Sequence, residues 1–147
     1  MPLPRKAIIL LIGAVLLLSG KISAQVEVTL IVKGFRNNNG DLLMGVFNDP
    51  GQFPYDPFLE FAWPKDTLNG DQMVLTFTLP EKGFYACSVL DDENSSGGMD
   101  KNFIGVPKEY FGFTNDARPG LFSPPSYKDC LVEIKESRNK LTIKLKK

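Results

Sequence analysis

The feature that most restricts the fold of this chain is an apolar side chain at every second position in several short segments. In residues 26–33, valine and leucine occupy the even positions, and mostly polar side chains occupy the odd ones. A similar alternation occurs in residues 72–79, 84–90, 130–134 and 141–146. A period of two places the apolar side chains on one face of a β-strand, whereas an amphipathic helix needs a period of about 3.6. These segments are therefore predicted to be strands with one buried face.

Turn-forming residues separate the predicted strands. Asn39-Gly40 supplies the positive φ angles that a tight turn needs, so we expect residues 42–48 to return as a hairpin antiparallel to residues 26–33. Several prolines then force a loop before a further short strand at 58–63. About seven short strands with turn signals every 8 to 12 residues predict an all-β fold, an antiparallel β-sandwich of immunoglobulin or transthyretin type.

One long stretch, residues 91–126, shows no clear strand pattern. Loops of more than about 15 residues in compact domains are usually functional or disordered. This loop is too aromatic for a solvated linker, because it contains or adjoins Phe103, Tyr110, Phe111, Phe113, Phe122 and Tyr127. We expect it to fold back over an edge or end of the sandwich, where it buries its aromatic side chains in a satellite core.

The N-terminus has the order of a secretory signal peptide. Arg5 and Lys6 precede an apolar run, residues 7–18, which is followed by Ser19-Gly20-Lys21-Ile22-Ser23-Ala24, with the small residue Ala24 at the expected cleavage site. The run is shorter than the roughly 20 residues that cross a bilayer, so no permanent transmembrane anchor is expected. We predict a signal peptide at 1–24, a single β-sandwich domain at 25–147, and export to the periplasm or the medium.

Composition argues against catalysis and against nucleic acid as a partner. Without the leader, 14 basic residues face 17 acidic ones, and a net charge of −3 gives no electrostatic footprint for nucleic acid or anionic lipid. The absence of histidine removes the commonest general base and metal ligand. Asp91 and Asp92 are adjacent on a predicted strand and should point to opposite faces, which weakens the rival prediction of a carboxylate-based glycan hydrolase. We therefore predict no enzymatic activity.

Two cysteines, Cys87 and Cys130, lie in the exported part of the chain. An oxidising compartment permits a disulfide between them. The alternative is that both are buried thiols that act as small apolar residues. Cys87 lies in mid-strand at an inward position and is a poor candidate nucleophile.

Residues 92–100 follow the first part of an EF-hand calcium loop. Oxygen-bearing side chains occupy relative positions 1, 3, 5 and 9, which are Asp92, Asn94, Ser96 and Asp100. Gly97 at position 6 permits the sharp bend, but position 12 is Phe103 instead of the bidentate glutamate. Calcium is therefore expected to bind weakly, with a dissociation constant of about 10⁻⁴ to 10⁻³ M. The alternative is that Asp92, Asn94 and Asp100 cap a tight turn through backbone amides.

Aromatic side chains suggest a second kind of site. Flat rings bury a large area at low entropic cost and are common at binding faces. A platform for a glycan or an envelope protein is predicted from Trp63, Tyr110, Phe111 and Phe113. The alternative is that these rings belong to the satellite core beneath the 103–127 loop.

Short motifs throughout the exported part resemble a bacterial family, domain of unknown function 2141. They are Gly40-Asp41, Gln52-Phe53-Pro54, Gly83-Phe84-Tyr85-Ala86, Asp92-Glu93-Asn94, Asn102 to Pro107, Tyr110 to Asn115 and Ser123 to Tyr127. Asp91 stands where such proteins often have histidine, and the usual Asn-Gly-Asn-Gly run is reduced to residues 94–97. The resemblance implies a small exported envelope domain without an assigned activity. We predict a non-catalytic binding or structural module.

Overall fold

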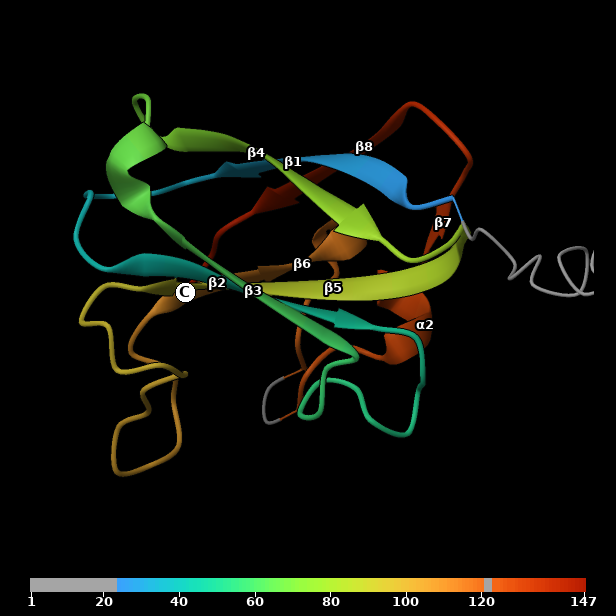
Figure 1. The fold of residues 1–147 in the computed structure, drawn as a ribbon. Helices are drawn as coiled ribbons and strands as arrows, with labels where there is room; N and C mark the ends of the chain where they lie inside the picture. The colour runs from blue at the N-terminus through green and yellow to red at the C-terminus, as the bar shows by residue number, and fades with distance from the viewer. Residues whose placement is uncertain (1–23, 121–122) are drawn as a thin grey trace, which may run out of the picture.

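The computed structural model describes residues 24–120 and 123–147. The predicted signal peptide lies outside the described residues, except for Ala24. The described chain forms eight strands in two facing sheets, with short helical turns between them (Figure 1). This arrangement confirms the predicted β-sandwich.

The smaller sheet has the strand order β4-β1-β8. β1 (Val26–Lys33) pairs antiparallel with β4 (Gln72–Leu79) and parallel with β8 (Asn139–Lys144). The alternating apolar side chains of these strands point inward, as predicted, and all four even-numbered residues of β1 from Val26 to Val32 are buried. The parallel pair departs from the fully antiparallel sandwich that the sequence suggested.

The larger sheet has the order β3-β2-β5-β6. β2 (Asp41–Phe47) lies between β3 (Leu59–Pro64) and β5 (Gly83–Asp92). The other side of β5 pairs with β6 (Tyr110–Phe113) near its end and with β7 (Val132–Ile134) near its beginning. The main core fills the space between the two sheets.

The predicted hairpin between β1 and β2 is wrong. β1 and β2 belong to different sheets, and residues 34–40 carry the chain across the end of the sandwich. The backbone amides of Gly34 and Phe35 donate to the Asp71 carbonyl at 2.8 and 3.1 Å, and the Phe35 ring enters the core. These contacts with a distant residue direct the chain away from the hairpin that the local Asn-Gly signal favoured.

The long 91–126 stretch contains one strand that the alternation did not reveal. β6 has four residues and includes Gly112, whose lack of a side chain hides the periodicity. A Cβ at Gly112 would lie 2.6 Å from the Ile143 side chain, so glycine allows β6 to approach β8 of the other sheet. The Phe111 backbone also exchanges hydrogen bonds of 2.9 and 2.8 Å with Lys146, which joins the two sheets at this edge.

A second apolar cluster covers the outer face of the larger sheet. Phe53, from the loop after β2, makes edge contacts with Phe47, Phe113 and Tyr127. Tyr127 begins the short helix α2 (Tyr127–Cys130). This cluster is the satellite core that the aromatic content predicted, whereas Phe122 lies outside the described residues.

Candidate functional site

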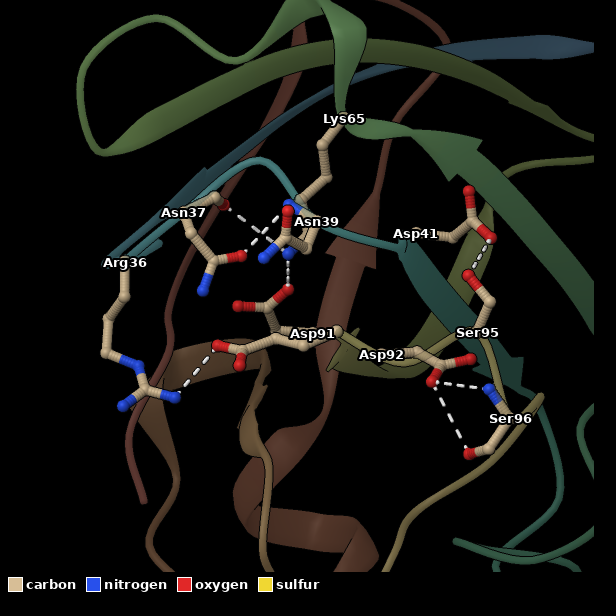
Figure 2. Close-up of polar contacts among 10 residues, drawn as sticks. Arg36, Asn37, Asn39, Asp41, Lys65, Asp91, Asp92, Ser95 and Ser96 are labelled. Atoms are coloured by element: carbon tan, nitrogen blue, oxygen red, sulfur yellow. Dashed lines mark hydrogen bonds and ion pairs between the residues drawn. The ribbon is translucent and has the colours of Figure 1, made fainter.

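Charged side chains gather at one end of the sandwich, which we call the polar end. It is formed by the 34–40 connection, by the turn η1 (Lys65–Thr67) after β3, and by the end of β5 (Figure 2). β5 reaches this end because its pairing with β2 continues to Leu42↔Asp91 and Asp41↔Asp92. The charged residues there are Arg36, Lys65, Asp91, Asp92 and Glu93.

Lys65 and Asp91 form an ion pair with both side chains fully buried (Figure 2). The Lys65 ammonium also donates to the Asn37 carbonyl at 3.5 Å and lies 5.5 Å from the centre of the Phe35 ring. Apart from Lys65, the Asp91 carboxylate has no hydrogen-bond partner among the described residues. Burial raises the pKa of Asp91 above its ordinary value, although Lys65 opposes the rise. The pair closes the core at the polar end.

Arg36 forms the outer layer of the polar end. Its guanidinium donates to Glu93 Oε1 at 2.8 Å and lies 4.3 Å from the centre of the Tyr110 ring. A cation over an aromatic face is attracted by the ring quadrupole. The Arg36 side chain therefore covers a face of Tyr110 that a glycan would need.

The Asp92 carboxylate organises the loop after β5. It accepts hydrogen bonds from the backbone amides of Ser96 at 2.9 Å and Gly97 at 2.8 Å, and it is almost completely buried. Asn94 donates from its side-chain amide to the Asp100 carboxylate at 2.6 Å. These contacts match the turn-capping alternative. Within residues 24–120 and 123–147, no three acidic or cysteine side chains are grouped as a metal site, and calcium binding stays a prediction.

Glu109 is a buried acid that the sequence analysis missed. Its Oε2 accepts the Asp100 backbone amide at 3.2 Å, while its Oε1 is buried without a hydrogen-bond partner in the described structure. Burial raises the pKa of Glu109, the Asp100 amide opposes this, and the charges of Asp92 and Asp100 raise it further. Nothing local marks Glu109 in the sequence, because its place beside residues 92–100 depends on the return of the chain to β6.

The four aromatic residues predicted as a platform do not share one surface. Trp63 is on β3, at the opposite edge of the larger sheet from β6, and it stacks on Phe61 with the ring centres 5.5 Å apart. Tyr110 packs against the main core, whereas Phe111 packs against the second cluster and Phe113 is part of it. The structure therefore brings together only Phe111 and Phe113, and Phe113 is buried.

Three exposed apolar side chains, one of them the most exposed of the described residues, lie close together in the segment 101–107, which we call the apolar hairpin. Its ends pair through Lys101 and Pro107. Phe103 is 100% exposed, Ile104 68% and Val106 49%. This result corrects the expectation that the loop would bury all its aromatic rings. The run of apolar residues around Gly105 was a signal for this surface, but local sequence cannot show which rings reach the satellite core.

Cys87 and Cys130 are free, buried thiols in this structure. Cys87 belongs to the main core and Cys130 to the second cluster, so they lie in different apolar environments. Burial raises the pKa of each thiol to about 12. The Thr114 hydroxyl connects the two segments, because it accepts the Cys87 amide at 3.0 Å and donates to the Cys130 carbonyl. The disulfide stays a prediction.

A shallow groove of about 430 Å³ runs beside the edge where β6 meets the C-terminal segment. Phe111 and Phe113 line it together with the basic residues Arg118, Lys144, Lys146 and Lys147. Asp116 also lines the groove, and its carboxylate accepts the Lys144 backbone amide at 3.0 Å.

The fold and the polar end define a small all-β sandwich protein in which the buried charges bind one another or the backbone. In the part of the chain that the structure describes, no helix is long and apolar enough to cross a membrane. The exposed apolar hairpin is a surface feature that this arrangement leaves unexplained.

The chain belongs to the bacterial family described as "Uncharacterized protein conserved in bacteria (DUF2141)", which matches residues 30–142. This match confirms the family resemblance that the sequence motifs indicated. Comparison with curated proteins and with solved structures found no match.

Proposed function

We propose that this protein is a non-catalytic module exported to the bacterial envelope, where it binds a partner through the apolar hairpin. The observation that carries the proposal is the exposure of Phe103, Ile104 and Val106 at one tip. Single exposed apolar residues are ordinary, but a group of them marks an interaction surface. The bacterial family and the predicted leader support a role in the envelope.

The use of the acidic side chains supports a non-catalytic role. Asp91 is paired with Lys65 inside the sandwich, and Asp92 holds backbone amides of its own loop. A glycan hydrolase needs two carboxyl groups that face one cleft about 5 to 9.5 Å apart. Asp91 and Asp92 point to opposite faces of the larger sheet, so their carboxyl groups do not face one cleft.

Cosedimentation with envelope fragments tests the proposal. The full chain is expressed, and the purified protein is mixed with membranes and cell-wall sacculi from bacterial cells. We expect the protein to pellet with these fragments, and the variant Phe103→Ser/Ile104→Ser to remain in solution. Val74→Ser is the matched control, because Val74 is an exposed apolar residue on β4, in the other sheet. Equal pelleting of the hairpin variant and the wild type would contradict the proposal.

A second candidate function, weak calcium binding by residues 92–100, is favoured by Glu109. This carboxylate has a buried oxygen without a hydrogen-bond partner in the described structure, and it contacts the Asp100 amide. It would supply the acidic ligand that the sequence pattern lacks at position 12. Binding would require Asp92 to release the amides of Ser96 and Gly97, which agrees with a dissociation constant of about 10⁻⁴ to 10⁻³ M.

Calcium titration followed by NMR tests this candidate. We expect the amide signals of Ser96 and Gly97 to shift most, because their hydrogen bonds to Asp92 change. Glu109→Gln should weaken binding, whereas Glu133→Gln, an exposed acid on β7, should not. The candidate fails if calcium leaves the signals of residues 91–109 unchanged.

A further inference from the structure

We propose that the apolar hairpin inserts its tip into the interfacial region of a lipid bilayer with anionic headgroups. This inference rests on the proposed function, because it names the partner that the hairpin binds. Three observations support it: hydrogen bonds stabilise the hairpin, it projects from the sandwich, and lysines flank its apolar tip.

Several hydrogen bonds within the hairpin stabilise its conformation. The Asn102 side-chain oxygen accepts the amides of Ile104 at 3.1 Å and Val106 at 2.9 Å. The Asn102 backbone amide donates to the Val106 carbonyl at 2.9 Å, and the Gly105 amide donates to the Asn102 carbonyl at 2.9 Å. Gly105 adopts a positive φ of 85°, which glycine permits. A surface that is ordered before binding loses less conformational entropy on contact.

The hairpin is convex and stands away from the rest of the molecule. In Figure 1 the gold segment that follows β5 hangs below the larger sheet and reaches beyond its neighbours. Phe103 is fully exposed, so no part of the described chain covers its ring. A fluid interface receives a projecting apolar tip without needing a complementary groove.

The spacing of charged and apolar residues matches the depth of a membrane interface. Lys101 and Lys108 are both exposed, and they flank the tip. Phe103 is two residues from Lys101, which corresponds to at most about 7 Å at about 3.3 Å per residue. Peripheral apolar segments enter the interface to a depth of about 5 to 10 Å. When Phe103 reaches the acyl boundary, the lysine ammonium groups therefore lie at the level of the headgroup phosphates.

The acidic residues that adjoin the hairpin lie farther from its tip than the lysines do. Asp100 and Glu109 are each one residue farther from the tip than the neighbouring lysine, and Glu109 is buried. The net charge of the exported part is mildly negative, but charges more than about 8 to 10 Å away are largely screened at physiological ionic strength. The two lysines are therefore the charged residues nearest to the tip along the chain.

Binding to vesicles of defined composition tests the inference. The protein purified from cells that express the full chain is sedimented with phosphatidylcholine vesicles, and with vesicles of phosphatidylcholine and phosphatidylglycerol in equal amounts. We expect reversible binding that is stronger on the anionic vesicles. Phe103→Ser/Ile104→Ser should reduce the partition coefficient by about tenfold for each residue. Val74→Ser should leave it unchanged.

Two further variants separate insertion from surface attraction. Lys101→Gln/Lys108→Gln should weaken binding to anionic vesicles by about fivefold for each lysine. A tryptophan at the tip, Phe103→Trp, should be quenched by lipids with brominated acyl chains, whereas Trp63, which is the only native tryptophan, should not be quenched. All five residues changed in these variants, including Val74, are exposed, and unchanged circular dichroism and melting temperature verify the fold.

Three outcomes would overturn the inference. One is no binding of the wild-type protein to anionic vesicles at low salt, and another is equal binding of the hairpin variants and the wild type. The third is a wild-type dimer in solution that the Phe103→Ser/Ile104→Ser variant loses, which would assign the tip to a second copy of the chain. If envelope fragments still bind the wild type through the hairpin while vesicles do not, the lipid assignment fails and the proposed function stands.

Discussion

The buried Lys65–Asp91 pair allows a sharp test of how charge stabilises this sandwich. Both side chains are fully buried, and the Asp91 carboxylate depends on Lys65 as its partner. Removing one partner of such a pair costs about 3 to 5 kcal/mol, because the other charge stays buried without compensation. Since small domains are stable by about 5 to 15 kcal/mol, either Lys65→Met or Asp91→Val should remove a large part of the total stability.

The double variant Lys65→Met/Asp91→Val should recover most of this loss. It removes both charges together, so the desolvation penalty of the ions disappears with their attraction. Methionine keeps the length of the lysine stem, and valine suits a strand position. We expect the double variant to lie within about 1 kcal/mol of the wild type, which corresponds to a coupling energy of several kcal/mol.

The pH dependence of Lys65→Met provides a second readout. Without the ammonium, burial acts on Asp91 without its main opposing interaction and raises the pKa of Asp91 further. A carboxyl with a raised pKa in the folded state stabilises the fold below its unfolded pKa of about 3.9, and this contribution is lost as pH rises. Lys65→Met should therefore be closest to the wild type near pH 4 and should lose stability toward pH 7.

Urea unfolding of the protein without its leader, followed by circular dichroism, measures these free energies. Glu136→Gln is the control, because it breaks the exposed Lys82–Glu136 ion pair and should not change the midpoint. A coupling energy below about 1 kcal/mol, together with a Lys65→Met stability that does not vary with pH, would refute a buried pair.

Three further predictions follow from single positions. Gly40→Ala should lower the free energy of unfolding by more than about 2 kcal/mol, because Gly40 has a φ of +70° and the new Cβ would lie 1.9 Å from the Asp92 carbonyl oxygen. Gly70→Ala is the control in the same urea assay. Gly70 also has a positive φ but has open space around it, so the loss should be only about 1 kcal/mol. Burial raises the pKa of Glu109, so ionisation of Glu109 destabilises the fold as pH rises above about 4.3. Glu109→Gln should therefore flatten the pH profile of the melting temperature. An unchanged profile would contradict this prediction. Burial raises the pKa values of Cys87 and Cys130 to about 12, so both thiols should resist alkylation in the native protein. Both should react in guanidinium without reductant. If neither reacts in guanidinium, the two cysteines form the predicted disulfide.

Local sequence patterns were sufficient to predict most of the strands. The alternation in β1 and β4 predicted their extents and inward faces, because a period of two depends only on neighbouring residues. The family motifs were equally visible in the sequence, and the match over residues 30–142 confirmed them. The opposite directions of Asp91 and Asp92 were also predictable, since adjacent side chains on a strand alternate.

Contacts between residues far apart in the chain could not be predicted from these local patterns. Asn39-Gly40 favours a hairpin locally, yet contacts of Gly34 and Phe35 with Asp71 carry the chain to the other sheet. Lys65 resembles an ordinary surface lysine until the sandwich buries it against Asp91. Whether Phe103 or Phe113 enters an apolar cluster likewise depends on which segments cover it. Backbone conformation depends mainly on neighbouring residues in the sequence. Burial and charge pairing depend instead on which distant segments the two assembled sheets bring together.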